Sequence, residues 1–408
     1  MDIKKLAAEQ EEYIIACRRH LHRHPELSCQ EFETTKFILS ELEKMGIPYT
    51  TFNGCTGCVA EIKGTQRAGG FRGAKHAPEL ECGRTVMLRA DIDALPINEA
   101  DHTKSYCSVN PGVMHACGHD CHTAMLLGAA RILAAHRDEL RGTVKLIFQM
   151  GEEIGRKSEV YVKRGALEGV DAIFGMHVWA LMEAGTFNFE AGERMACSDR
   201  FTLQIEGTAA HASTPWLGRD ALLAASACVM ALQQISSRQN KAQNSLVISV
   251  GMMNGGTGGD ILCDHVELVG TVRTFDRKLR ENMPERIAQV VKKAAEAWGC
   301  TAECEYYFGP SPLINDDEEL VQTARGAAEK VMGKDAFAPL RKMTGAEDFS
   351  VYMEHVPGIF GYLGARNRAK GFDCAHHHPA FDVDEAILKD GAAIYAQFAL
   401  DYLSQAAS

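Results

Sequence analysis

Short β-rich runs alternate with helical segments over the first 190 residues, and this alternation constrains the fold more than any other feature. A polar helical region extends to about residue 45, and a helical pattern over residues 123–136 follows later. The β-rich runs are TVMLRAD (85–91), TVKLIFQM (143–150) and DAIFGMHV (171–178). Strands that alternate with helices in this way indicate an α/β domain with a largely parallel central sheet.

Acidic and imidazole side chains stand where these predicted strands end. Asp91 and Asp93 follow the first run, Glu152 and Glu153 follow the second, and His177 lies near the end of the third. Open α/β sheets generally bind their ligands at the carboxyl ends of the strands. We therefore expect the functional site at this edge of the sheet.

A different pattern occupies residues 195–306. Its segments are RFTLQIEG, a helix over 219–237, SLVISVGMM, HVELVGTVRTFD, a helix over 278–298, and TAECEYYF. This βαββαβ order predicts a compact ferredoxin-like unit. The run PGIFGYLG (357–364) and a C-terminal helix from Glu385 then return to the α/β pattern. We expect a catalytic domain formed by residues 1–194 and 307–408, with residues 195–306 inserted as a second domain, since 408 residues exceed one ordinary core.

The charge balance bears on the class of partner. The chain has 43 Lys and Arg against 54 Asp and Glu, a net charge of −11, which argues against a nucleic-acid or anionic-membrane partner. The longest apolar stretch (221–232) is shorter than the roughly 18 residues of a membrane span, and the N-terminus lacks the pattern of a secretory signal. Most of the 14 cysteines are expected to be reduced core thiols. These features predict a cytoplasmic enzyme.

The segment HACGHDCHTAML (115–126) offers Cys117 and His119 just ahead of an apolar helix. Borderline-soft divalent ions such as Zn²⁺ bind imidazole nitrogen, thiolate sulfur and carboxylate oxygen. A single buried His or Cys is often only a core residue, and a dithiol switch that uses Cys121 is a rival interpretation. This segment alone therefore leaves metal binding open.

The adjacent pair Glu152 and Glu153 strengthens the case for a metal. Two neighbouring carboxylates repel each other when buried, so a cation would offset the cost of burying them. His177 and the run AHHHPAFD (375–382) add imidazoles, although a triple His is also compatible with a solvent-facing turn. Because such residues recur at the ends of successive elements, the sequence predicts a metal site.

Motifs along nearly the whole chain, about residues 13–400, resemble one family in their order and composition. They are RRHLHRHPELS, LRADIDALPI, GVMHACGHDCHTAMLLGAA, FQMGEE, GMHVW, AHASTPWLGRDAL, VRTFD, GAEDFS and HHPAFD. The family is that of hippurate hydrolases, N-acyl-amino-acid amidohydrolases and indole-acetyl-amino-acid hydrolases, which are co-catalytic metallopeptidases. The resemblance implies a zinc-exopeptidase-like α/β catalytic domain interrupted by a βαββαβ satellite domain that commonly dimerises.

The resemblance also implies a ligand set for two divalent ions, which could be Zn²⁺, Mn²⁺, Co²⁺ or Ni²⁺. The implied ligands are Cys117, His119, Glu153, His177 and His377, with Cys117 as a bridging thiolate. His377 is selected because the family pattern is His, any residue, Pro, and His377 stands two residues before Pro379. His376, His378, Cys121 and His122 are then non-ligands.

Two catalytic roles follow from the resemblance. Glu152 resembles the general base that takes a proton from the attacking water and delivers it to the leaving amine, although it could instead only orient a ligand. His211 in AHASTP matches a histidine that stabilises the tetrahedral intermediate in the partner subunit, with an ordinary turn histidine as the alternative. Asp91 or Asp93 could hold a ligand imidazole by its second nitrogen, or cap the following turn.

The substrate side departs from the family pattern. Family members usually have NVIPD where this chain has DILCD, which places Asp260 in the position of Asn and Cys263 in that of Pro. A carboxylate at position 260 would repel a free substrate carboxylate nearby, so the substrate could carry an amine or lack a carboxylate there. Arg273 in GTVRTFD is either a clamp for a carboxylate or carbonyl group, or a partner in a surface salt bridge.

The sequence thus predicts a two-metal amidohydrolase that cleaves an N-acyl amino acid or a small peptide conjugate and forms a homodimer. A dipeptidase or aminopeptidase with the same chemistry is an alternative. A catalytically silent metal-binding protein is a third interpretation, and the presence of Glu152, Glu153 and His211 argues against it.

Overall fold

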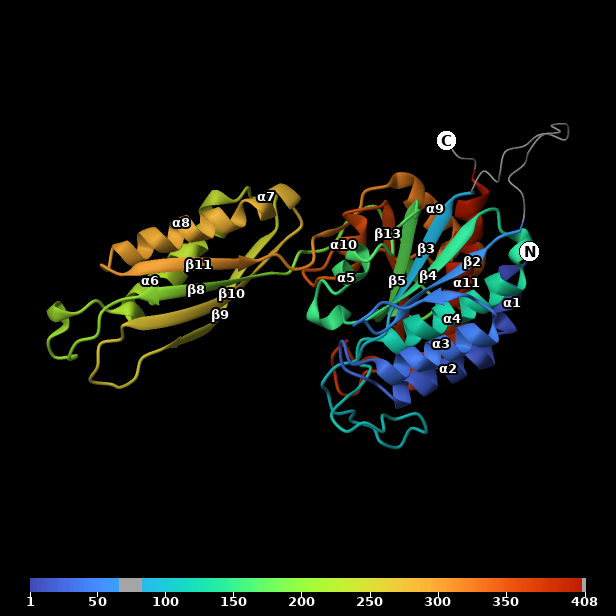
Figure 1. The fold of residues 1–408 in the computed structure, drawn as a ribbon, viewed down its shortest axis with the longest axis horizontal. Helices are drawn as coiled ribbons and strands as arrows, with labels where there is room; N and C mark the ends of the chain where they lie inside the picture. Colours follow the sequence, from blue (N-terminus) through green and yellow to red (C-terminus); the bar gives the residue numbers. More distant parts are fainter. Residues whose placement is uncertain (66–82, 406–408) are drawn as a thin grey trace. The chain divides into compact units, whose positions relative to one another are not determined.

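The computed structural model describes residues 1–65 and 83–405, which form two compact units (Figure 1). The first unit contains residues 1–192, 315–340 and 351–408, and the second contains residues 193–314 and 341–350. The sequence had suggested that 341–350 belong with the catalytic segments, whereas this stretch packs with the second unit. Backbone bonds from Ala196 to Met343 and Gly345 hold it there.

A seven-stranded sheet forms the centre of the first unit, in the order β1-β2-β4-β3-β5-β13-β6. The four inner strands β4, β3, β5 and β13 are mutually parallel, and the outer strands β1, β2 and β6 pair antiparallel. The prediction of an α/β fold with a mostly parallel sheet is therefore confirmed. The strand bounds are β1 Tyr49–Thr50, β2 Cys58–Lys63, β3 Thr85–Asp91, β4 Thr143–Gln149, β5 Ala172–Glu183, β6 Phe187–Asn188 and β13 Gly358–Arg366.

Long helices cover the sheet of the first unit, and α4 and α11 both pack against β3 (Figure 1). All but three residues of α4 are buried, since it also contacts α2 and α11. The predicted polar helix before residue 45 is three helices. The helix bounds are α1 Ile3–Ala8, α2 Glu11–Arg23, α3 Phe32–Lys44, α4 His119–Ala135, α5 Ser158–Lys163, α9 Glu318–Met332, α10 Phe349–Met353 and α11 Leu388–Ser404.

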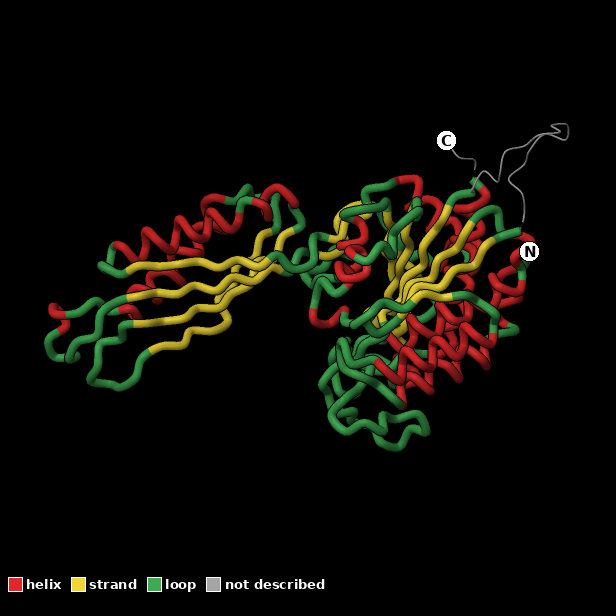
Figure 2. Tube along the Cα trace, in the orientation of Figure 1, coloured by secondary structure: helices red, strands yellow, loops and turns green. Residues whose placement is uncertain are grey.

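The second unit is a four-stranded antiparallel sheet, in the order β11-β8-β10-β9, with α6 and α8 packed on it (Figure 2). The buried residues alternate along β8 and β10, which fits helices on one face only. Its elements are β8 Asp199–Glu206, α6 Ala221–Gln234, β9 Leu246–Gly255, β10 His265–Thr274, α7 Arg277–Glu281, α8 Met283–Glu296 and β11 Thr301–Tyr307.

A small sheet of β7 (Gly192–Met195) and β12 (Leu313–Asn315) forms where the chain passes from one unit to the other. Among residues 1–65 and 83–405, no helix has both the length and the apolar character needed to cross a bilayer.

Candidate metal centre

A left-handed glycine sets the direction of the chain at the start of α4. Gly118 has φ 93°, and a Cβ atom there would lie 2.4 Å from Cγ2 of Val178, so a larger residue would collide with β5. Cys117 and His119 flank this glycine. The tight packing therefore brings a thiol and an imidazole to the middle of β5, which continues to Glu183, beyond the end predicted at residue 178.

His119 is held by Asp93, which follows β3. The Nδ1 atom of His119 lies 3.1 Å from Oδ1 of Asp93. Because a carboxylate only accepts, Nδ1 carries the hydrogen, and in the neutral imidazole Nε2 keeps a lone pair. Burial lowers the pKa of His119, but Asp91 and Asp93 outweigh burial and raise the pKa well above its ordinary value. Of the two aspartates suggested from the sequence, Asp93 is the one that orients this imidazole.

The turn after β4 carries the two glutamates. Gly151 precedes them in a left-handed conformation (φ 66°), and its N–H donates to the buried Glu31 at 2.9 Å. The N–H groups of Glu152 and Glu153 both donate to the carboxylate of Asp93, each at 3.1 Å. Asp93 therefore joins the glutamate turn to the histidine that starts α4.

His177 projects from β5 toward Cys117. Its Nδ1 atom donates to the carbonyl of Val178 at 2.6 Å, which leaves the lone pair on Nε2, and Nε2 lies 3.5 Å from Sγ of Cys117. Burial and the neighbouring His122 and His376 hold the pKa of His177 well below its ordinary value. His177 is therefore a neutral imidazole with a lone pair directed at the thiol.

His377 lies on the loop after β13 in a left-handed conformation (φ 63°), which is unusual for a residue other than glycine. Its backbone N–H donates to the carbonyl of Ala116 at 2.8 Å. Its Nε2 atom lies 3.4 Å from Oε1 of Glu153, and the bond to Glu153 raises the pKa of His377. The loop thereby brings a third imidazole to the residues next to Cys117.

The five side chains expected to bind metal form two groups that share Cys117. Cys117, His119 and His177 form one group, and Cys117, Glu153 and His377 form the other; within each, the possible ligand atoms lie within 4.8 Å of one another. Among the described residues, Nε2 of His119 is buried without a hydrogen-bond partner, and it lies 3.9 Å from Oε1 of Glu153. Burial also raises the pKa of the Cys117 thiol, and Glu153 raises it further. Buried polar atoms without partners are costly, and the thiolate, imidazole and carboxylate set suits borderline divalent ions, so these residues fit a pair of metal ions.

His122 and His376 occupy other positions. Nδ1 of His122 donates to Asp91 at 2.6 Å, and its Nε2 accepts the N–H of Val178 at 2.9 Å, so both nitrogens are occupied. His376 donates to the carbonyl of Val178 at 3.0 Å. Although Asp91, His119 and His122 lie close enough together to form a possible metal group, these bonds give His122 and Asp91 a role in fixing β5 beside His177.

Ser28 and Glu31 are two further residues that support the site and that no sequence motif had indicated. Ser28 donates to Oδ2 of Asp93 at 2.6 Å, and Oε1 of Glu31 accepts from Cys29 and Gly151 while Thr56 donates to Oε2. The motif RRHLHRHPELS contained Ser28, but neither its spacing nor its periodicity indicated a contact with a residue so far along the chain.

The second unit carries the remaining predicted residues. His211 is exposed, and its Nδ1 accepts the N–H of Ser213 at 3.1 Å, so in a neutral imidazole the hydrogen lies on Nε2. The His211 turn pairs with the Asp260 loop, since the N–H of Ala212 donates to the carbonyl of Asp260 at 2.9 Å and His211 bridges Ile261. Arg273 on β10 is half-buried and makes no ion pair with any residue in 1–65 or 83–405, which disfavours the salt-bridge interpretation.

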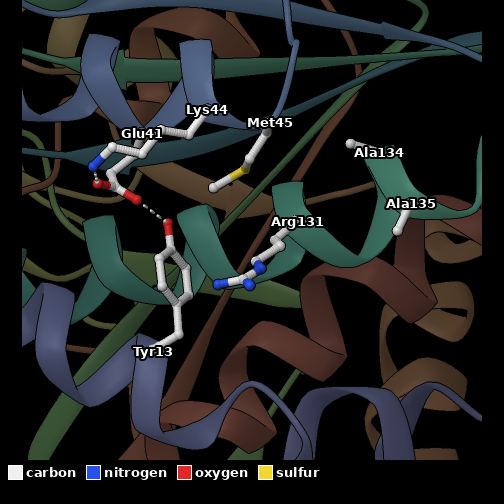
Figure 3. A pocket seen from close by; sticks show the side chains of 7 residues that line it. All are labelled: Tyr13, Glu41, Lys44, Met45, Arg131, Ala134 and Ala135. Carbon is white, nitrogen blue, oxygen red and sulfur yellow. Dashed lines mark hydrogen bonds and ion pairs between the residues drawn. The ribbon is translucent and has the colours of Figure 1, made fainter.

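A cavity of about 340 Å³ lies elsewhere in the first unit, among α2, α3 and α4 (Figure 3). In it the Tyr13 hydroxyl donates to Glu41 at 2.9 Å, and the guanidinium carbon of Arg131 lies 4.5 Å from the centre of the Tyr13 ring. None of the predicted metal ligands lines it. The cavity is therefore distinct from the metal centre.

The chain is similar to several known proteins. The sequence profile of peptidase family M20/M25/M40 matches residues 87–401. An N-acetyl-L-cysteine deacetylase from Bacillus subtilis is 40% identical, covering 94% of this chain and 87% of that protein. The IAA-amino acid hydrolase ILR1-like 4 of Arabidopsis thaliana is 36% identical over 96% of this chain and 86% of its own. A crystal structure of a Bacillus subtilis protein, described as a dinuclear metal-binding peptidase of the M20 family, superposes with a TM-score of 0.82 at 34% identity, covering 98% of this chain and 99% of that one.

Proposed function

Because the chain belongs to peptidase family M20/M25/M40 and is a metal-dependent amidohydrolase, we propose a specific substrate class for it. In this proposal, the protein hydrolyses the amide bond of an N-acyl amino acid. The names of the two relatives above support this substrate class, since N-acetyl-L-cysteine and IAA-amino acids are acylated amino acids. The observation that carries the proposal is the sharing of Cys117 between two groups of possible ligands.

We assign one ion to Cys117, His119 and His177, and the other to Cys117, Glu153 and His377. Divalent ions held there would lower the pKa of a bound water molecule and would polarise the scissile carbonyl. The Cys117 thiolate, which both groups share, would offset part of the repulsion between two cations held there. The candidate ions are Zn²⁺, Mn²⁺, Co²⁺ and Ni²⁺. The availability of each metal in the cell, as well as the affinity of the site for it, determines which one is bound.

Glu152 is the proposed general base. It lies in the same short turn as Glu153 and within 4.8 Å of possible ligand atoms of His119 and Glu153, but outside both groups that contain Cys117. In this role its carboxylate takes the proton of the attacking water and passes it to the nitrogen of the leaving amino acid. A positioned base of this kind contributes roughly 10² to 10⁴ in rate.

His211 is the proposed donor to the negatively charged oxygen of the tetrahedral intermediate. The N–H of Ser213 directs the imidazole hydrogen to Nε2, which is the tautomer that a donor needs. We expect this side chain to serve the metal centre of a second copy of the chain. Arg273 is the proposed clamp for the substrate carboxylate or carbonyl, and Asp260, whose loop pairs with the His211 turn, is the proposed determinant of which amino-acid end is accepted.

A homodimer formed through the second unit is part of the proposal. Exposed large apolar side chains lie on α6 and on the edge strand β9; they are Leu222, Leu223 and Met230 on the helix and Val247, Met252 and Met253 on the strand. An edge strand offers unpaired backbone groups, and exposed apolar side chains favour burial against a partner. We also place the protein in the cytoplasm, which is consistent with free thiols at all cysteines of the described residues.

The test compares the wild type with Glu152→Gln. Hydrolysis of N-acetyl and longer N-acyl amino acids is measured against dipeptides and amino-acid amides, together with metal content per chain. We expect turnover of N-acyl amino acids by the wild type, and loss of turnover with unchanged metal content in the variant. Turnover confined to dipeptides would reject the substrate assignment, and full activity of Glu152→Gln would reject the base.

A further inference from the structure

Arg18 is fully buried on α2, a helix that supplies none of the proposed metal ligands. Its guanidinium contacts three carboxylates. Nε donates to Oδ2 of Asp120 at 2.8 Å, Nη2 donates to Oδ1 of Asp382 at 2.8 Å, and Nη1 donates to Oε1 of Glu385 at 3.2 Å. Asp120 and Asp382 are themselves buried, so this is an internal cluster of charges that needs close pairing to be tolerated.

The two buried carboxylates lie on two segments that are far apart in the sequence, and each segment carries a proposed ligand. Asp120 directly follows His119 in the first turn of α4, and Asp382 belongs to the loop that carries His377. Both have further partners: His22 contacts Asp120 at 2.8 Å, and Lys104 contacts Asp382 at 2.8 Å. Within residues 1–65 and 83–405, however, Arg18 is the one side chain that forms ion pairs with both.

We propose that Arg18 is a positioning residue for the two-metal centre, which fixes the His377 loop against the first turn of α4. The inference rests on the proposed function, because it concerns the same two ions. A guanidinium is suited to this task since its planar, fixed donors reach two carboxylates at once, whereas a lysine ammonium acts as a point charge.

The two ions depend on Arg18 to different extents. His119 is buried, starts a long helix and is oriented by Asp93, so its position has other support. The side chain of His377 is 53% exposed, on a loop residue whose own backbone is held by one bond to Ala116. Loosening the loop should therefore weaken the ion held by Glu153 and His377 more than the ion held by His119 and His177.

The experiment measures the affinity of the purified full-length protein for Zn²⁺ by competition with a chromogenic chelator. The test variant is Arg18→Met, and the matched control is Arg19→Met. Arg19 is the next residue on α2 and pairs with the same Glu385 at 2.6 Å, but its side chain is 46% exposed and contacts neither Asp120 nor Asp382. Both substitutions are also combined with His377→Ala and, separately, with His177→Ala. Each of these histidine variants should retain one of the two ions.

We expect Arg18→Met to weaken one of the two ions by about 10- to 100-fold, the range seen when residues that orient metal ligands are replaced. In the His177→Ala background, Arg18→Met should lower the affinity for the ion at Glu153 and His377 to the same extent. In the His377→Ala background, it should change the affinity for the other ion by less than about threefold. Arg19→Met should leave both ions unchanged. Equal weakening in both backgrounds, or no change in either, would overturn the proposal.

A second variant covers the case in which Arg18→Met does not fold. Asp382→Asn keeps the guanidinium and the shape of the loop but removes the charge that ties them, and it should give the same selective loss. Binding of fewer than two ions by the wild type would count against the proposed function itself. Two ions in the wild type and unchanged affinities in the Arg18 and Asp382 variants would defeat only the present inference.

Discussion

Asp93 and His119 are joined by a contact of 3.1 Å between Oδ1 and Nδ1, and the same carboxylate accepts the N–H groups of Glu152 and Glu153. One side chain after β3 therefore orients a proposed ligand at the start of α4 and fixes the turn that carries the proposed base and another ligand. The carboxyl ends of two neighbouring parallel strands are coupled through this group.

Replacement of Asp93 by asparagine should weaken metal binding by about 10- to 100-fold. The uncharged amide has one acceptor oxygen in place of two, so it cannot accept from both His119 and the N–H of Glu153. Zinc titration by calorimetry checks this. Ser28→Ala is the control, since it removes one donor to Asp93 while leaving the carboxylate in place. An Asp93→Asn protein that binds zinc as tightly as the wild type would show that Asp93 does not orient His119.

The charge of Asp260 should set the preference for the amino-acid end of the substrate. Asp260→Asn removes a carboxylate from the loop beside His211, so kcat/KM for N-acyl amino acids with a free carboxylate should rise relative to the matching amides, by roughly three- to tenfold. Asp264→Asn, on the same loop, is the control. A ratio that stays constant in Asp260→Asn would mean that this carboxylate lies too far from the substrate to matter.

His211 should act across the dimer. His211→Ala should lower kcat by about 10² to 10³, the usual cost of losing a donor to the oxyanion. Co-expression of His211→Ala chains with Glu152→Gln chains should restore roughly a quarter of wild-type activity, because half of the dimers would then contain one complete site. Recovered activity in the mixture would show that His211 acts in the partner subunit. If His211 acts within its own chain, the mixture would stay inactive.

The stability of the metal-free protein should depend on pH through His22. Burial lowers the pKa of His22, but Asp120 and Glu99, which contact its two ring nitrogens at 2.8 and 3.3 Å, raise it above the ordinary value. A raised pKa stabilises the fold most below about pH 6.5, the unfolded value, and this contribution is lost as pH rises through the folded pKa.

The difference in free energy of unfolding between wild type and His22→Gln should therefore shrink from about pH 5 to about pH 9, as measured by urea denaturation in the presence of a chelator. His24→Gln, whose ring donates to a backbone carbonyl at 2.8 Å, is the control. A difference that grows with pH would contradict the charged state inferred for His22.

Local sequence patterns predicted the central strands because β3, β4 and β5 are apolar, β-branched runs buried inside the sheet. They did not predict β2, whose CVAEIK mixes small, charged and apolar residues, nor the breaks that divide the N-terminal region into three helices. Residues 341–350 were assigned to the wrong neighbours because only contacts distant in sequence, such as the one between Met343 and Arg194, place them with the second unit.

The candidate site, like the fold, was predictable only in part. Acidic and imidazole residues at strand ends indicated where metal chemistry would lie, and the resemblance to a family selected His377 among three neighbouring histidines. The contacts that hold these groups were not predictable, since Ser28, Glu31 and Arg18 reach residues as far as 65, 120 and 367 positions away in the chain, respectively. Such pairs have no periodic signal and become visible only once the fold brings them together.

The most direct test of the account is the number of metal ions bound per chain by wild type, Cys117→Ala, His177→Ala and His377→Ala after equilibrium dialysis against zinc. Because Cys117 belongs to both groups of ligands, its replacement should remove or strongly weaken both ions, whereas each histidine replacement should affect one. Two tightly bound ions in Cys117→Ala, or loss of only one, would contradict a centre built around a shared thiolate.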